Sequence, residues 1–312
     1  SRISICDTLL LTQKKARQDM IRDYACRPEM SEQGITGLIR EYDLPVPEIY
    51  KRREQMIKAA VLEREKRKKP FCTLPFDHTL EAENMGGNIR YGNEKAGPRA
   101  AAPVCSSLEE LSFLSRMDPE SGRMAETLAA CRMLREQGEE VVFQMSGPYT
   151  IWNTLIELKQ VFKAVRKTPE QVEALFQKLE EDLLGLLLEV KKNGVRMVSY
   201  ADSAGGLSIL GPRMLEWTTD VFTAPFLRKA EHILGQEMVM ILCPKTACAL
   251  EDTGSGVREE IALPEEMTYQ KACIYAAGKA RFPAQMCING GGRVLKSKTL
   301  QVIRLCRNEI EE

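Results

Sequence analysis

Four residues or turns able to do chemistry follow apolar stretches of this chain, at the points where we expect strands to end. They are Asp77, the turn that begins at Gly147, Asp202 and Cys243. Carboxylates act as general bases or orient cationic groups, and a thiolate is a nucleophile or a metal ligand. Because functional residues of a parallel barrel gather where its strands end, we expect Asp77, Tyr149, Asp202 and Cys243 to converge on one cavity.

Asp77 directly follows the apolar run 71–76, so its carboxylate is expected to face the barrel mouth rather than bulk water. There it could orient a substrate that carries a cation or an N–H group, or act as a general base. The alternative is structural, an N-cap for the next helix. Of two glutamates on that helix, Glu81 and Glu83, we expect one to point inward and the other to contact solvent.

The turn from Gly147 to Thr150 directly follows the apolar stretch 141–145. Glycine and proline let the backbone approach a ligand closely, and the ring of Tyr149 offers a face for stacking. We therefore predict that Gly147 and Tyr149 contact a cofactor, with an ordinary strand-to-helix turn as the alternative.

Asp202 comes just after the strand expected over 196–200 and is followed by small residues up to Gly206. A carboxylate beside such an open loop predicts a catalytic role for Asp202 and a cofactor-binding role for Gly205, with a helix cap as the alternative. The Gly205-Gly206 pair is not a dinucleotide fingerprint, because that pattern requires a third glycine and a later acidic residue.

Three cysteines are candidate metal ligands. Cys243 closes the apolar stretch 238–242, Cys248 follows it, and Cys287 precedes a run of glycines. Thiolates can hold zinc, which in a catalytic site takes three protein ligands and leaves one position open. The only histidines, His78 and His232, are not adjacent to Cys243 in the sequence. We expect Cys243 as a ligand, with Cys287 or Cys248 as the second, and buried reduced thiols as the alternative.

The expected fold is α/β, a (β/α)8 TIM-type barrel that is incomplete or irregular, with an N-terminal helical extension. Residues 1–69 are expected to form the extension and residues 70–312 the barrel. Apolar residues at three- and four-residue steps predict helices, and short apolar runs predict strands. Helices are expected over 7–24, 31–42, 47–68, 119–137 and 169–193, and strands over 71–76, 141–145, 196–200, 238–243, 260–263 and 285–288. A complete barrel has eight strands, so the pattern falls short over 88–105 and at the C-terminus.

Composition excludes some classes of partner. Lysine plus arginine equal aspartate plus glutamate at 44 each, whereas nucleic-acid binding requires a cationic excess. The longest apolar run, 183–190, is far shorter than the roughly 20 residues that span a bilayer. The chain starts at Ser1 without a basic and apolar leader, and its ten cysteines are scattered. We therefore expect a cytoplasmic protein that binds neither nucleic acid nor membranes.

The order and spacing of several motifs resemble one enzyme superfamily. The stretch 75–86, with its Glu-Ala-Glu sequence, is followed by Gly97-Pro98, by 147–150 and by Asp202. Together they resemble the uroporphyrinogen decarboxylase superfamily, and most of all its cobalamin-dependent methyltransferases that act on coenzyme M or related thiols. The resemblance covers about residues 70 to 300. It implies a (β/α)8 barrel.

The resemblance also implies a function and its cofactors. In those methyltransferases a His-x-Cys and a later cysteine hold zinc, which activates a thiol toward methylcobalamin carried by a partner corrinoid protein. Here Cys243 is kept and the histidine is absent. We expect a corrinoid-dependent methyltransferase that moves a methyl group between a corrinoid protein and a small donor or thiol acceptor.

Two alternatives follow from the same resemblance. The Asp77-to-Gly86 offset matches the decarboxylase, where the aspartate organises pyrrole N–H groups, but the arginine-rich segment that binds substrate carboxylates has no counterpart. Burying such carboxylates without cations is costly, so uroporphyrinogen is not expected to be decarboxylated. The other alternative is a non-catalytic protein that binds a corrinoid or tetrapyrrole, which the missing histidine favours.

Overall fold

A parallel sheet forms the centre of the computed structural model, which describes residues 21–24, 35–93, 95–290 and 292–306. The sheet has four strands in the order β1-β4-β5-β6, and every neighbouring pair is parallel. The strands are β1 (Cys72–Leu74), β4 (Val141–Ser146), β5 (Met197–Ala201) and β6 (Val239–Leu242). These are the first four strands predicted from the sequence, so a parallel α/β fold is confirmed.

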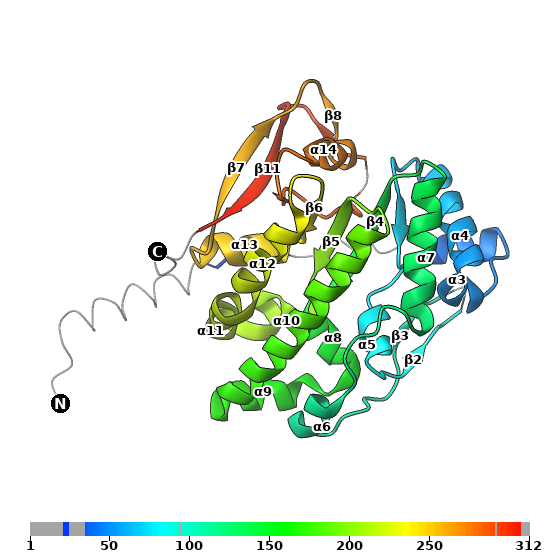
Figure 1. Cartoon of the computed structure of the whole chain (residues 1–312). Coiled ribbons are helices and arrows are strands. Elements are labelled where there is room, and N and C mark those ends of the chain that lie inside the picture. Colours follow the sequence, from blue (N-terminus) through cyan, green and yellow to red (C-terminus); the bar gives the residue numbers. More distant parts are fainter. Residues whose placement is uncertain (1–20, 25–34, 94, 291, 307–312) are drawn as a thin grey trace.

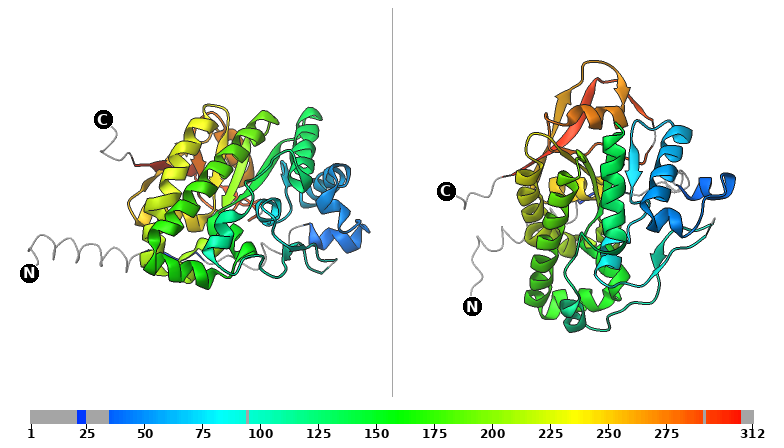
Figure 2. Two further views of the ribbon diagram at one scale, coloured as in Figure 1. Left: turned by 60° about the horizontal axis from the view of Figure 1, so that its bottom comes forward. Right: turned by 45° about the vertical axis from the view of Figure 1, so that its right-hand side comes forward.

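Helices pack on the outer face of this sheet, where Val141, Phe143 and Met145 of β4 join the main apolar cluster. Alternate residues of a strand point to opposite faces, which is why these three share one side. Figure 2 shows the green and yellow helices side by side. The helices that connect the strands are α7 (Gly122–Glu136), α8 (Pro148–Leu155), α9 (Leu158–Lys167), α10 (Pro169–Lys192), α11 (Leu207–Thr218), α12 (Ala224–Leu234) and α13 (Pro244–Asp252), with a 3-10 turn at Ser203–Gly205 and a π turn at Thr219–Thr223.

Further helices and one hairpin precede and follow β1. The N-terminal helices are α2 (Thr36–Glu41), α3 (Glu48–Lys51) and α4 (Arg53–Arg67), and α4 packs against β1 and α7. After β1 come α5 (Leu80–Asn84), the hairpin of β2 (Ile89–Arg90) and β3 (Arg99–Ala100), and α6 (Leu108–Phe113). Of the helix predicted over 7–24, residues 1–20 lie outside the described part, and 21–24 are not helical.

The last part of the chain forms a C-terminal lobe, residues 256–305, built on antiparallel pairs. In it β11 (Thr299–Leu305) pairs with β7 (Gly256–Ala262) and β9 (Phe282–Pro283), and β8 (Met267–Thr268) pairs with β10 (Val294–Leu295) beside α14 (Tyr269–Ala276). The strand predicted over 260–263 is therefore the end of an antiparallel strand, and the one predicted over 285–288 is wrong. A closed eight-stranded barrel is not found among the described residues.

The C-terminal lobe covers the inner face of the parallel sheet. Val142, Met197 and Val239 point to that face and form one apolar cluster with Tyr269 of α14 and Leu300 of β11, among other residues. Figure 1 places the lobe, in orange and red, at the end of the sheet away from α8. Since α8 follows the carboxyl end of β4, the lobe covers the amino half of the inner face, and its Asn289 also reaches Gln144 further along β4.

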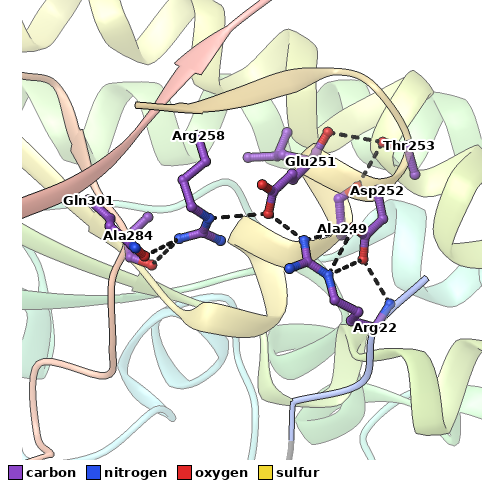
Figure 3. Close-up of polar contacts among 9 residues, drawn as sticks. Arg22, Ala249, Glu251, Asp252, Thr253, Arg258, Ala284 and Gln301 are labelled. Atoms are coloured by element: carbon purple, nitrogen blue, oxygen red, sulfur yellow. Dashed lines mark hydrogen bonds and ion pairs between the residues drawn. The ribbon is translucent and has the colours of Figure 1, made fainter. Parts of the chain in front are cut away.

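A polar network joins the N-terminal segment, α13 and the lobe (Figure 3). The Arg22 backbone and guanidinium bind Asp252, and the guanidinium also pairs with Glu251. Arg258 of β7 donates to Glu251 at 3.1 Å and to the Gln301 side chain at 3.3 Å. Arg22 is about half exposed, so this Arg22 network lies at the surface rather than in the core.

Candidate active site

The inner face of the sheet becomes polar toward the carboxyl ends of its strands. Val142 pairs in register with Met197, and Met197 with Val239, to give an apolar layer. One step further along β4 and β5 the paired residues are Gln144 and Ser199, and Ser146 follows on β4. All three are buried. This carboxyl edge of the inner face is therefore where polar groups are held out of water.

Asp77 lies in a buried ion-pair network beside this edge. One carboxylate oxygen accepts hydrogen bonds from the backbone N–H and the hydroxyl of Thr79, at 2.9 and 2.6 Å. The other oxygen pairs with Arg123 of α7, which also donates to Glu83 at 2.8 Å. The Glu83 carboxylate in turn accepts from the Tyr91 hydroxyl. Both oxygens of Asp77 are thus engaged within the fold.

Asp202 caps the first turn of α8 from the neighbouring strand. Its carboxylate accepts from the Thr150 backbone N–H at 2.7 Å, the Thr150 hydroxyl at 2.8 Å and the Tyr149 N–H at 3.2 Å. Burial raises the pKa of Asp202 to about 6, although these hydrogen bonds and the charge of Lys245 favour the ionised form. The sequence left a helix cap as an alternative, and Asp202 does bind N–H groups of a helix, but those of α8 rather than of the turn that follows it.

Gly147 and Gly205 make room for Asp202. A Cβ atom at Gly147 would lie 2.4 Å from the Cβ of Asp202 and 2.8 Å from the Tyr200 hydroxyl. A Cβ atom at Gly205 would lie 2.4 Å from Oδ2 of Asp202. Both glycines are needed for close packing around this carboxylate, whereas the sequence suggested an approach to a cofactor.

The Tyr149 ring lies in the core rather than at a cavity. It is fully buried, packs edge-on against Trp152 and Phe176, and donates or accepts a hydrogen bond with Thr218 at 2.9 Å. The ring does not offer the expected face for stacking on a ligand, because neighbouring aromatic rings pack against it. Only the backbone N–H of Tyr149 takes part in the carboxyl edge, through Asp202.

The three candidate zinc ligands have different surroundings. Cys243 is the N-cap residue of α13 and donates its N–H to the Tyr200 carbonyl. Cys287 lies close enough to Tyr269 of the lobe to raise the pKa of the Tyr269 phenol. Cys248 lies near the charged groups of Arg22 and Asp252. Within the part of the chain that the structure describes, no three His, Cys, Asp or Glu residues group closely enough to hold a metal. The described residues therefore do not fit the zinc set implied by the resemblance.

Sequence reasoning named Glu81 without choosing it, yet Glu81 is the fully buried carboxylate at the carboxyl edge. Its Oε1 accepts from the Ser146 backbone N–H at 2.8 Å, and Oε2 is buried without a hydrogen-bond partner among the described residues. The Ser146 hydroxyl lies 3.4 Å from Nδ1 of His78. Burial raises the pKa of Glu81 and lowers that of His78. The sequence indicated this residue only as one of two glutamates, Glu81 and Glu83, of which one was expected to point inward.

The structure therefore gathers part of the predicted site. Asp202, Gly147, Gly205 and the Tyr149 backbone lie together, and Ser146 connects them along β4 to His78 and Glu81. Asp77 precedes His78 but faces Arg123. A single cavity shared by Asp77, Tyr149, Asp202 and Cys243 remains a prediction.

Comparisons with known proteins find methyltransferases that are similar in sequence and in fold. The methylcobamide:CoM methyltransferase MtaA of Methanosarcina barkeri is 23% identical over 242 residues, which is 76% of this chain and 70% of the relative. MtbA of Methanosarcina mazei, with the same enzyme description, is 31% identical over 183 residues, 57% of this chain and 52% of the relative. A solved methyltransferase from Methanosarcina mazei has the same fold, with a TM-score of 0.60 at 21% identity, over 77% of this chain and 71% of that one.

A family match covers the parallel sheet but ends before the C-terminal lobe. The profile described as uroporphyrinogen decarboxylase (URO-D) matches residues 38–252, from α2 to the end of α13. This is more than half of the chain and includes the whole carboxyl edge. The chain therefore belongs to the uroporphyrinogen decarboxylase (URO-D) family.

Proposed function

We propose that this chain is a corrinoid-dependent methyltransferase, which moves a methyl group between a corrinoid held by a partner protein and a small molecule. Relatives named methylcobamide:CoM methyltransferases support the reaction class. A corrinoid protein is accordingly the proposed partner, and a thiol or another small methyl donor or acceptor is the proposed substrate.

The observation that carries the proposal is the polar carboxyl edge within an otherwise apolar inner face. Small-molecule sites commonly combine apolar walls with a few placed polar groups. Gln144, Ser146 and Ser199 supply such groups from two adjacent strands, and Asn289 of the lobe donates to Gln144 at 3.3 Å. A substrate at this edge would meet side chains held by the sheet, which favours precise orientation.

The carboxylates of this region have distinct roles in the proposal. Asp202 fixes the turn between β4 and α8, because it satisfies N–H groups that the helix leaves open. Asp77 and Arg123 neutralise each other next to His78. Both are positioning residues, and Glu81 is the carboxyl group whose second oxygen makes no hydrogen bond among the described residues.

Decarboxylation of uroporphyrinogen is disfavoured by the state of Asp77. A carboxylate that organises pyrrole N–H groups needs free acceptor positions, whereas three of the roughly four positions of the Asp77 carboxylate are used by Thr79 and Arg123. The sequence also lacks the cationic segment that substrate carboxylates require.

We also propose a cytoplasmic location. Cys72, Cys131 and Cys273 are buried free thiols, which suit a reducing compartment. In the described part of the chain no helix has the length and apolar character needed to cross a bilayer.

The function can be tested by mixing the full chain anaerobically with methylcobalamin and a thiol, such as coenzyme M or 2-mercaptoethanol. We expect loss of the methylcobalamin spectrum and formation of the methyl thioether, both faster than without protein. Binding of cobalamin without methyl transfer to any thiol, or from any methyl donor, would favour the non-catalytic alternative. Coproporphyrinogen formed from uroporphyrinogen would contradict the proposal.

A further inference from the structure

One oxygen of Glu81 has a clear role in the fold. Strand β1 ends at Leu74, but its neighbour β4 continues to Ser146, so the Ser146 N–H lies beyond the last β1 carbonyl. Glu81 Oε1 accepts this N–H at 2.8 Å and so continues the ladder above β1. A buried N–H left without an acceptor would be costly. A glutamine would provide the same acceptor through its amide oxygen.

The second oxygen of Glu81 has no comparable role. Oε2 is buried and makes no hydrogen bond within the described residues. Buried polar atoms in native proteins nearly always have a partner, and a catalytic role or a bound group is one explanation for an exception. The fold therefore needs one oxygen of this side chain, and the other is left for a group that enters the site.

The ionisable groups around Glu81 influence how strongly it holds a proton. His78 favours its neutral form because burial lowers its pKa. Asp77 and Glu83 share one cation, Arg123 of α7, and the negative charge of Asp77 also raises the pKa of Glu81. The helix α8, which packs against α5, carries no charged residue. Burial raises the pKa of Glu81, which makes its ionised form a stronger proton acceptor than an exposed carboxylate.

We propose that Glu81 is the catalytic proton acceptor for a neutral thiol substrate, which binds with its S–H group at Oε2 beside Ser146 and His78. This inference rests on the proposed methyl transfer. In the step, the S–H bond breaks and its proton moves to Glu81, while sulfur forms a bond to the methyl carbon of methyl-Co(III) corrinoid. The Co–C bond breaks and its electron pair stays on cobalt as Co(I). Glu81 then returns the proton to solvent.

The proposal is tested with Glu81→Gln, which keeps the acceptor for Ser146 and removes the basic oxygen. With methylcobalamin and 2-mercaptoethanol near neutral pH, we expect the transfer rate to fall by about 100-fold or more, the usual contribution of a general base. As pH rises above the pKa of the thiol, the thiolate forms in solution, so the variant should approach the wild-type rate. The matched control is Glu109→Gln, an exposed glutamate of α6, which should behave as wild type at every pH.

The outcomes separate the two proposals. An inactive wild-type chain overturns methyl transfer, and the role of Glu81 with it. An active wild type with an unchanged rate and pH profile in Glu81→Gln overturns the role of Glu81 alone. If Glu81→Gln does not fold, infrared difference spectra of the wild type during turnover decide. We expect a new protonated-carboxyl band that shifts in D₂O, and absence of that band overturns the inference.

Discussion

The family-matched region and the C-terminal lobe bring side chains of opposite polarity to the inner face of the same sheet. The lobe covers the amino half with apolar side chains such as Tyr269 and Leu300. The matched region, residues 38–252, places polar residues such as Gln144 and Ser146 on the carboxyl half. The difference fits the proposal that chemistry takes place at the carboxyl ends of the strands while packing at the amino ends contributes stability, as in parallel barrels, although the cover here is an antiparallel lobe.

The largest effect should come from breaking the charge network at the carboxyl edge. Arg123→Ala leaves Asp77 and Glu83 without their cation in a buried setting, so we expect a loss of about 3–5 kcal/mol in unfolding free energy. Urea denaturation measures this loss. Arg132→Ala, on the exposed side of the same helix, is the control and should change stability little. Equal effects would show that the network does not anchor the edge.

The lobe should matter for stability through packing alone. Leu300 is fully buried against the sheet, so Leu300→Ala should cost about 2–5 kcal/mol, the usual range for such a cavity. We expect a single cooperative transition at lower temperature in calorimetry, because lobe and sheet share an apolar cluster. The half-exposed Val294 gives the control Val294→Ala. A separate early transition for the lobe would contradict shared packing.

Asp202 should give the edge an unusual pH dependence. Its folded-state pKa of about 6 lies above the usual value of 3.8, so the folded state binds this proton more tightly than the unfolded state. The contribution to stability therefore grows as pH falls from about 6 toward 4, by up to about 3 kcal/mol. Comparing urea unfolding of wild type and Asp202→Asn over this range isolates the effect. A wild type that loses more stability than the variant on acidification would reverse the expected sign.

The Arg22 network between the N-terminal segment and α13 should have the smallest effect on stability. Arg22→Ala removes ion pairs to Glu251 and Asp252, but Arg22 is about half exposed. Surface pairs of this kind contribute about 0–1 kcal/mol and weaken with salt. We expect a slight decrease in melting temperature that disappears at high salt. A large decrease in melting temperature that does not depend on salt would show that the Arg22 network acts as part of the core.

The parallel half of the fold was predictable because its strands are short apolar runs followed by long helices with clear periodicity. The antiparallel lobe was not, since β7 from Gly256 to Ala262 contains three consecutive charged residues, 258–260, and its partner β11 lies far along the chain. The strand expected over 285–288 instead lies in a loop whose apolar residue Ile288 packs into the lobe. Periodicity within one segment does not reveal such tertiary pairing.

The sequence led to residues that the structure brings together, but not to the contacts that they make. Strand ends pointed to Asp202 and Gly147, which meet at the carboxyl edge, and their part in a functional site stays a prediction. The sequence could not show that Arg123, far along the chain, would neutralise Asp77, or that Tyr149 would turn into the core. Glu81 was recognisable only as one of two candidates, because its helix has just over one turn and no clear apolar face.

Hydrogen exchange on the full chain, with and without excess methylcobalamin and thiol, tests the central claim that methyl transfer takes place at the carboxyl edge. The account predicts slower exchange in peptides that cover 78–83, 144–150 and 199–206. Peptides that cover 256–262 and 299–305 should be unchanged. Slower exchange confined to the C-terminal lobe, or no change anywhere while methyl transfer proceeds, would contradict the account.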